Sequence, residues 1–311
     1  MKAVVFEEFG GPEVLKVTEV ETPEPGAGQV RVRVWAAGVN PADLKIRAGF
    51  MEAVFPTRFP ATPGLEFAGV VDAVGPGVTG LAPGDEVLGW TRGGGAYAEY
   101  LVTGADLVTP KPAGLDWPTA AALPVATETA HRALGLLGLR AGETLIVHGA
   151  AGAVGSVAVQ DAVAAGLRVV GTARADRHAW VRSLGALPVA YGEGLEQRVR
   201  EALGEAAAGS GAVVDAAFDA AGHGALPALI ALRGDAADRV VTTADPAAAE
   251  FGVPFSAVPE PSAPVLAAQA LAAAEGRLRV LVAETFALAD AASAQHHAET
   301  APAAGKLILV P

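Results

Sequence analysis

A glycine-rich turn between an apolar run and a helical segment constrains this chain more than any other feature. Residues 145–156 read Leu-Ile-Val-His-Gly-Ala-Ala-Gly-Ala-Val-Gly-Ser. The three glycines depart by one small residue from the dinucleotide fingerprint, in which a pyrophosphate sits on backbone N–H groups at a helix N-terminus. Small residues around the second glycine leave room for that approach, and Gly155 allows close packing of the helix on its strand.

The surroundings of this turn favour a dinucleotide over other nucleotides. A second apolar run with β-branched residues, 166–172, follows at the distance that a βαβ unit requires. No Gly-Lys-Ser/Thr follows the glycines, so a P-loop NTPase is not supported. Taken alone, the turn is also compatible with a strand-to-helix connection that binds no ligand.

The distribution of strand and helix patterns predicts two domains of different class. Residues 1–118 read as short strands separated by Pro/Gly clusters, whereas strands alternate with helix-length segments from 119 onward, including a strand expected at 213–218. Such alternation is typical of a parallel, doubly wound sheet. The apolar C-terminal segment 305–311 is expected to rejoin the first domain as a strand. We therefore predict an α/β protein with a discontinuous catalytic domain, 1–118 and 262–311, and a cofactor domain, 119–261.

Composition limits the compartment and the partners that we expect. The 311 residues are 51% hydrophobic, which is enough for two cores, and the net charge of −12 argues against nucleic acid or an anionic membrane as partner. The absence of cysteine removes disulfides, thiolate nucleophiles and cysteine-ligated zinc. The N-terminus lacks the pattern of a signal peptide, and the alanine-rich run 263–274 is too short to span a membrane. We expect a cytoplasmic protein without a transmembrane segment.

Several motifs along the chain, in a consistent order, carry a family resemblance. They are Gly-Val-Asn-Pro-Ala-Asp-Leu-Lys at 38–45, Pro-Gly-Leu-Glu-Phe-Ala-Gly at 63–69, Pro-Gly-Asp-Glu-Val at 83–87, Gly-Gly-Ala-Tyr-Ala-Glu-Tyr at 94–100, the glycine turn, and Gly-Lys-Leu-Ile-Leu at 305–309. With these motifs the chain resembles the zinc-independent quinone oxidoreductase and enone reductase branch of the medium-chain dehydrogenase/reductase superfamily. The resemblance implies a GroES-like β-rich catalytic domain and a Rossmann cofactor domain.

The same comparison bears on metal chemistry. Zinc-dependent members of the superfamily carry Gly-His-Glu where this chain has Gly64-Leu65-Glu66, and Leu65 cannot ligate a metal. The histidines show no ligand spacing, and we expect the adjacent pair His296-His297 at the surface. We predict no metal site. Asp43 and Glu66 are alternatives for a general acid/base pair, although we favour a structural role in which they bind backbone N–H groups.

A metal-free site beside a nicotinamide suits hydride transfer to an already activated carbonyl. The resemblance places Asn40 and Thr129 beside the nicotinamide, and we predict both as catalytic residues together with Lys45. Lys45 stands where some quinone reductases have a tyrosine, so it is a candidate to stabilise an enolate or deliver a proton; the alternative is an exposed helix lysine. The apolar loop 47–59 predicts a small hydrophobic carbonyl or quinone substrate.

The end of the second cofactor-domain strand predicts NADPH as the cofactor. An NAD site requires an acidic residue there for the ribose 2′-hydroxyl, but the chain continues into Thr172-Ala-Arg174, with His178 nearby. These cations favour a 2′-phosphate. The acidic Asp176 opposes the preference for NADPH. The alternative is that these charged residues are solvated side chains at the start of a helix and bind no phosphate. By resemblance Tyr191 and Phe218 contact the cofactor, unless they are core aromatics. The full set of predicted cofactor-binding residues is Asn40, Thr129, Gly149, Ala151, Gly152, Ala153, Val154, Gly155, Thr172, Ala173, Arg174, His178, Tyr191 and Phe218.

The sequence leaves two alternative functions open and predicts a homodimer. The first rival is a non-catalytic NADPH-binding protein of structural or regulatory function, because relatives of this branch include such proteins. The second is a pathway-specific enoyl reductase acting on a carrier-bound chain. Residues 254–258 are predicted to form an edge strand of the cofactor sheet, which relatives pair across a homodimer.

Overall fold

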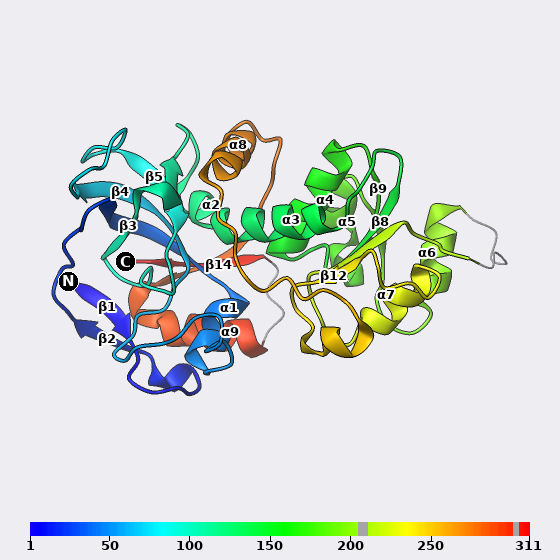
Figure 1. Cartoon of the computed structure of the whole chain (residues 1–311), viewed down its shortest axis with the longest axis horizontal. Coiled ribbons are helices and arrows are strands. Elements are labelled where there is room, and N and C mark those ends of the chain that lie inside the picture. Colours follow the sequence, from blue (N-terminus) through cyan, green and yellow to red (C-terminus); the bar gives the residue numbers. More distant parts are fainter. Residues whose placement is uncertain (205–210, 301–304) are drawn as a thin grey trace. The chain divides into compact units, whose positions relative to one another are not determined.

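A computed structural model describes residues 1–204, 211–300 and 305–311, and the chain folds as two compact units (Figure 1). The first unit comprises residues 1–128 and 261–311, and the second comprises residues 129–260. The first division falls inside helix α3, Pro124–Leu136, rather than at residue 118. The assignment of catalytic and cofactor roles to the two parts stays a prediction.

A seven-stranded sheet forms the body of the first unit. Its strand order is β13-β14-β3-β4-β5-β7, with β6 also paired to β3, and all pairs are antiparallel except β13–β14. Strands β1 and β2 form a separate antiparallel pair. The bounds are β1 Lys2–Val5, β2 Lys16–Glu19, β3 Gln29–Val39, β4 Glu66–Val74, β5 Glu86–Trp90, β6 Tyr100–Gly104, β7 Val108–Pro110, β13 Val282–Ala287 and β14 Lys306–Val310.

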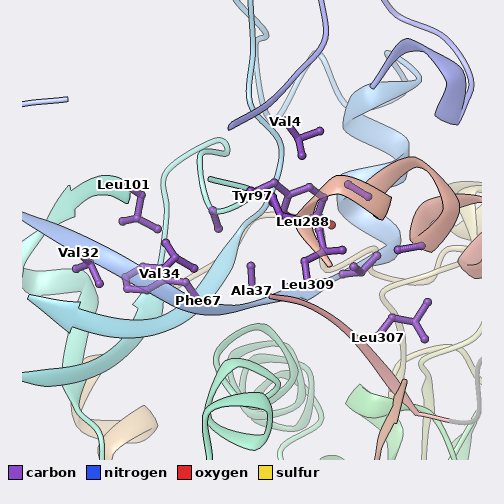
Figure 2. Close-up of a cluster of buried hydrophobic side chains, with 14 of the residues drawn as sticks. Val4, Val32, Val34, Ala37, Phe67, Tyr97, Leu101, Leu288, Leu307 and Leu309 are labelled. Atoms are coloured by element: carbon purple, nitrogen blue, oxygen red, sulfur yellow. The ribbon is translucent and has the colours of Figure 1, made fainter. Parts of the chain in front are cut away.

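The long strand β3 organises this sheet and its core. Val30, Val32 and Val34 are buried on one face while Arg33 is exposed on the other, as their alternation predicts. Figure 2 shows Val32, Val34, Phe67 and Leu309 among the buried side chains of this core. Strand β14 pairs with β3, which confirms that the C-terminal segment returns to the first unit as a strand.

Helices and short 3-10 turns complete the first unit. Helix α1 begins immediately after β3, with Pro41 as its first residue, where a missing N–H costs no helical hydrogen bond. The bounds are α1 Pro41–Arg47, α2 Trp117–Ala121, α8 Ala263–Ala274, α9 Ala291–Thr300, η1 Pro12–Val14, η2 Ala105–Leu107 and η5 Leu288–Asp290, with α3 continuing into the second unit.

The second unit is built on five parallel strands in the order β10-β9-β8-β11-β12. The chain reverses direction along the sheet between β8 and β11, and in such sheets ligands bind outside the carboxyl ends of the strands at this point. The predicted parallel sheet is therefore confirmed. The bounds are β8 Thr144–His148, α4 Ala153–Ala164, β9 Arg168–Thr172, η3 Ala175–Arg177, α5 His178–Ser183, β10 Leu187–Val189, α6 Leu195–Leu203, β11 Ala216–Asp219, α7 Leu226–Leu232, β12 Val240–Thr242 and η4 Pro246–Phe251.

Two predicted strands differ from the structure. Strand β11 begins at Ala216 rather than Val213, because the N–H groups of Val213 and Val214 both donate to Leu232 O at the end of α7. The edge strand expected at 254–258 is wrong. Only Phe255 forms an isolated bridge, to Thr242.

The hydrogen bonds of the 254–258 segment explain why it does not extend into a strand. Arg132 donates to the carbonyl oxygen of Ser256 at 2.7 Å, which occupies a group that a neighbouring strand would use. Ala257 N donates back to Phe255 O, which turns the chain, and Pro254 has no N–H to donate.

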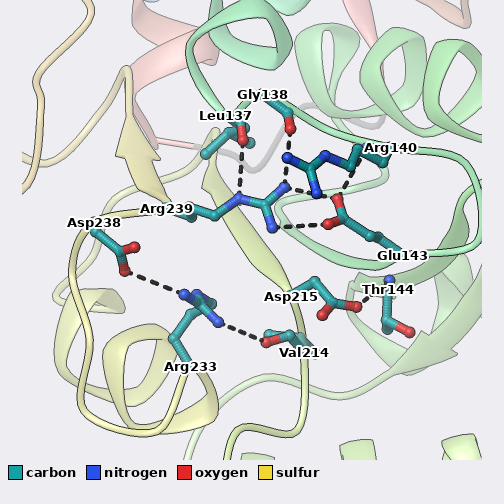
Figure 3. A network of polar contacts seen from close by, with 10 residues as sticks. All are labelled: Leu137, Gly138, Arg140, Glu143, Thr144, Val214, Asp215, Arg233, Asp238 and Arg239. Atoms are coloured by element: carbon teal, nitrogen blue, oxygen red, sulfur yellow. Dashed lines mark hydrogen bonds and ion pairs between the residues drawn. The ribbon is translucent and has the colours of Figure 1, made fainter.

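A charged tie joins the loop before β8 to the loop before β12 (Figure 3). Arg239 contacts both carboxylate oxygens of Glu143, at 3.0 and 2.7 Å, and Arg140 N donates to the same carboxylate. Hydrogen bonds from Arg239 lower the pKa of Glu143 to about 2. The bidentate pair fixes the connections that precede β8 and β12, the two strands on either side of β11.

Within the described ranges, the structure has no helix that is both long and apolar enough to cross a membrane.

Candidate active site

A buried ring of three polar side chains lies where β3 ends and α1 begins. Lys306 Nζ donates to Asn40 Oδ1 at 2.5 Å and forms an ion pair with Glu66 Oε1. Asn40 Nδ2 donates to the same Glu66 oxygen at 3.0 Å. All three residues are less than 5% exposed. The ring fixes the orientation of the Asn40 amide and leaves one hydrogen on Nδ2 for a further acceptor.

The sequence around this ring makes room for the Glu66 carboxylate. A Cβ on Gly38 would lie 2.0 Å from Glu66 Oε1, so only glycine fits at that point of β3. The second oxygen, Glu66 Oε2, accepts from Val125 N at the start of α3, at 2.7 Å. Both carboxylate oxygens are thus hydrogen-bonded, as a buried charge requires.

Asp43 extends the cluster from the first turn of α1. Its Oδ2 accepts from Asn40 N at 2.8 Å and from the Tyr97 hydroxyl at 3.1 Å. The predicted binding of backbone N–H groups by Asp43 and Glu66 is therefore confirmed. Burial raises the pKa of Asp43 to about 7, although the hydrogen bond from Asn40 opposes the shift. Burial also raises the pKa of Tyr97 well above its ordinary value, with the Asp43 charge adding to it.

The other two residues predicted as catalytic lie outside this ring. Lys45 is half-buried on α1, and its side chain forms no hydrogen bond or ion pair with the parts of the chain that the structure describes. Thr129 is buried on α3 and belongs to the second unit. Lys306 was not predicted. The sequence does indicate it, because Lys306 is the first residue of the apolar strand Lys-Leu-Ile-Leu-Val. A charged side chain in such a strand needs a buried partner of opposite charge.

The glycine turn lies at the switch point of the second unit, between β8 and α4. Packing requires two of its glycines: a Cβ on Gly149, which has φ 80°, would lie 2.7 Å from Ala221 Cβ, and a Cβ on Gly155 would lie 2.2 Å from Gly149 O. Gly152 differs, because its φ is −75° and its Cβ would meet only Gly149 O, at 3.4 Å. Among the described residues, no packing contact requires glycine at this position.

Helix α4 presents its first turn without a side-chain cap. Gly152 is the N-cap residue and supplies no side-chain hydrogen bond to the helix. The N–H groups of Ala153, Val154 and Gly155 are among those that a helix leaves without an internal partner. An uncapped first turn next to Ala151 and Gly152 is a suitable place for an anion.

Thr172 and Phe218 are both buried residues of the second unit, and Thr172 hydrogen-bonds to the glycine turn. Thr172 Oγ1 accepts from Gly149 N at 3.1 Å and bonds His148 Nδ1 at 2.8 Å, and its side chain is fully buried. Phe218 is fully buried in β11. Both side chains are buried, and their contact with a cofactor stays a prediction. Burial lowers the pKa of His148 below its ordinary value, opposed by Asp219 and reinforced by His223.

The segment after β9 carries the charges predicted to select a 2′-phosphate. Arg174 lies 3.1 Å from Asp176, and both side chains are exposed. His178 Nε2 lies 3.2 Å from Ala173 O, and Tyr191 is 51% exposed, with its ring edge-on to His148. The carboxylate that was expected to oppose the preference therefore contacts the arginine itself.

Within residues 1–204, 211–300 and 305–311, no group of three or more His, Cys, Asp or Glu residues is arranged to hold a metal ion. His296 is exposed on α9, and His297 is half-buried with its ring 6.1 Å from that of Phe286.

Two protein-family models match this chain. The family model "Alcohol dehydrogenase GroES-like domain" matches residues 26–113, and the model "Zinc-binding dehydrogenase" matches residues 184–309. Together they cover more than half of the chain. The chain belongs to the medium-chain dehydrogenase/reductase superfamily. The predicted resemblance and the predicted fold class are confirmed.

Individual members of the superfamily support the predicted branch. A quinone oxidoreductase of Rattus norvegicus is 42% identical over 175 residues, which are 56% of this chain and 53% of the relative. The chain thus matches only about half the length of such curated relatives. The structure of a quinone oxidoreductase from Coxiella burnetii has a TM-score of 0.89 at 28% identity, over 100% of this chain and 99% of the other. A mycobacterial protein complexed with NADPH has a TM-score of 0.83 at 29% identity over the whole of both chains.

Proposed function

We propose that this protein is an NADPH-dependent reductase of quinones or α,β-unsaturated carbonyls that works without a metal. Gly152 carries the proposal: it is a glycine that the fold does not need, at the position where a dinucleotide pyrophosphate would approach the backbone. The similarity to quinone oxidoreductases and to an NADPH complex supports the same cofactor and acceptor class. Leu65, together with the absence of cysteine, argues against zinc polarisation of a substrate.

The proposed cofactor site uses the turn and the first turn of α4. Backbone N–H groups of Ala153, Val154 and Gly155 would hold the pyrophosphate, where the helix dipole favours negative charge. Ala151 and Gly152 would leave the phosphates free to approach. Thr172 would act by fixing Gly149 N rather than by direct contact.

The 2′-phosphate would be recognised by the segment that follows β9. Arg174 and His178 supply the donors, the backbone of Ala173 connects them to the strand, and the exposed Tyr191 ring offers a surface for the adenosine. Because Asp176 already pairs with Arg174, a phosphate must compete with this carboxylate. The preference for NADPH over NADH is therefore smaller than an unopposed arginine would give.

The acceptor chemistry is assigned to Asn40, Thr129 and Lys45. When NADPH is bound, its nicotinamide supplies the hydride that adds to the conjugated carbon of the acceptor. Negative charge then develops on the acceptor oxygen, and the free Asn40 Nδ2 hydrogen is positioned to donate to it because Lys306 and Glu66 hold the amide. Thr129 would position the reacting groups, and Lys45 would stabilise the enolate or deliver a proton.

Turnover separates this function from its rivals. NADPH oxidation is followed anaerobically with a panel of quinones and enones, and we expect turnover of at least one class. Binding of NADPH with no turnover of any acceptor would favour a non-catalytic NADPH-binding protein. Turnover only of carrier-bound enoyl chains would favour a pathway-specific enoyl reductase.

Cofactor preference is tested at the Arg174 and Asp176 pair. Arg174→Ala should raise the KM for NADPH about tenfold while changing the KM for NADH little, because it removes a charge-assisted contact with the 2′-phosphate. Asp176→Asn should lower the KM for NADPH because it frees the arginine. Equal effects on both cofactors would contradict the phosphate assignment.

The proposed state in solution is a cytoplasmic homodimer. The segment after η4 exposes Phe255 at 44% and Val258 at 64%, next to Phe251 at 37%. These exposed apolar groups lie beside β12, the edge strand of the sheet, and such a surface favours association with a second copy.

A further inference from the structure

The first unit contains a cavity of about 270 Å³ in which Asp43, Arg58 and Arg92 take part. The loop before β4 supplies Thr57 and Arg58, and the loop after β5 supplies residues 92–95. A cavity of this size has room for a small organic ligand rather than for a single water molecule.

One lining residue of the cavity, Asp43, has a buried carboxylate oxygen that lacks a hydrogen-bond partner among the described residues. Asp43 is fully buried, and its Oδ2 accepts from Asn40 N and the Tyr97 hydroxyl. Its Oδ1 is also buried and has no hydrogen-bond partner among the described residues. A buried polar atom without a partner is costly, and a ligand in the cavity that Asp43 lines would satisfy it. Asp43 thus uses Oδ2 for hydrogen bonds within the protein, and Oδ1 is left to bind a ligand.

Two arginines line the same cavity. Arg58 is exposed and forms no ion pair or hydrogen bond within the described ranges. Among the residues that the structure describes, Arg92 pairs with Asp106 alone, at 3.1 Å, and both side chains are more than two-thirds exposed. A surface pair of this kind contributes little and can exchange for another anion. In a chain of net charge −12, two weakly held arginines at one cavity make a local site for an anion.

The backbone of the lining is held by glycines that packing requires. A Cβ on Gly64 would lie 2.4 Å from the Tyr97 ring, and a Cβ on Gly94 would lie 2.4 Å from Thr62 O. Both have positive φ, 102° and 127°, which L side chains rarely adopt. Packing therefore fixes the backbone conformation of this part of the cavity lining.

We propose that this cavity binds a small organic acid whose carboxylate contacts Arg58 and Arg92 and whose hydroxyl group donates a hydrogen bond to Asp43 Oδ1. The charge of the arginines selects the anionic end, and the orphaned Oδ1 selects the polar group at the other end. This inference goes beyond the proposed reduction, because none of its evidence concerns the dinucleotide.

Calorimetric titration of the full chain with three matched probes tests the proposal. 4-Hydroxybenzoate has both groups, benzoate lacks the hydroxyl, and 4-hydroxybenzamide lacks the charge. We expect 4-hydroxybenzoate to bind about tenfold more tightly than either of the others, since each lost contact leaves a polar group without its partner. Equal affinity for the three probes, or no binding at millimolar concentration, would overturn the proposal.

Variants locate the binding. Arg58→Gln and Arg92→Gln should each weaken binding of 4-hydroxybenzoate several-fold and leave 4-hydroxybenzamide unaffected. Arg277→Gln, which removes an exposed arginine of the same unit paired with Glu275, is the matched control and should change neither. Asp43→Asn should remove the preference for 4-hydroxybenzoate over benzoate. If Asp43→Asn does not fold, the arginine variants still decide: an effect of Arg277→Gln as large as theirs would overturn the assignment.

Discussion

At the scale of single residues, Gly152 separates ligand binding from folding. Replacing it with alanine adds a Cβ that meets only Gly149 O at 3.4 Å, so we expect a loss of stability below about 1 kcal/mol. The same Cβ would hold a pyrophosphate away from the α4 N-terminus, so the Kd for NADPH should rise at least about tenfold. Thermal unfolding and fluorescence titration measure the two effects. Gly155→Ala is the control, because its Cβ would lie 2.2 Å from Gly149 O and should destabilise the fold. Unchanged NADPH affinity in Gly152→Ala would refute the cofactor site.

Lys306 is the residue whose loss should cost most stability at the Asn40 ring. Lys306→Met leaves the buried Glu66 carboxylate without its cation, and removal of one partner of a buried ion pair costs about 3–5 kcal/mol. The double variant Lys306→Met with Glu66→Gln removes both charges and should recover part of that loss. Urea unfolding of the two single variants and the double variant gives the coupling energy. Strictly additive losses would show that the pair contributes nothing as a pair.

At the scale of elements, the tie between the loops before β8 and β12 predicts how the second unit responds to acid. The folded-state pKa of Glu143 is about 2, below its ordinary value of 4.5. A lowered pKa stabilises the folded state above pH 4.5, and this contribution is lost as the pH falls from 4.5 toward 2. Arg239→Gln should therefore destabilise the protein at pH 7, and its difference from the wild type should shrink below pH 4.5. Denaturant unfolding at several pH values checks this, with Arg92→Gln, from an exposed pair, as the control.

Elements built from contiguous residues were predicted from the sequence, whereas contacts between distant residues were not. The order of strand, glycine turn and helix around β8 was predicted correctly, because an apolar run and three glycines are contiguous in sequence. The ring of Asn40, Glu66 and Lys306 was not, because Lys306 and Asn40 are separated by 266 positions and meet only after β14 pairs with β3. The edge strand at 254–258 failed since Arg132 bonds the Ser256 carbonyl, a partner that no local pattern indicates.

The loop 47–59 shows the same limit. Its apolar composition predicts a hydrophobic substrate. In the structure, the part of the loop that lines a cavity includes Thr57 and Arg58, together with Asp43 and Arg92. Composition averages over a loop, whereas a cavity is defined by the few residues that face it.

At the scale of the whole molecule, the remaining question is how the chain associates. A net charge of −12 disfavours random contact between copies, so association requires a specific apolar surface. The exposed Phe251, Phe255 and Val258 are the candidates beside the edge strand β12. We expect sedimentation velocity at micromolar concentration to show a dimer.

Phe255→Asp should shift that dimer to monomer, because it places a charge in an apolar contact at an already acidic protein. Leu136→Asp is the matched control: it changes another exposed apolar residue of the second unit, 58% exposed, that lies outside this segment. A dimer that survives Phe255→Asp but not Leu136→Asp would move the interface to the end of α3. A wild type that sediments only as monomer would remove the need for any interface at the 254–258 segment, and its exposed apolar groups would then be ordinary surface residues.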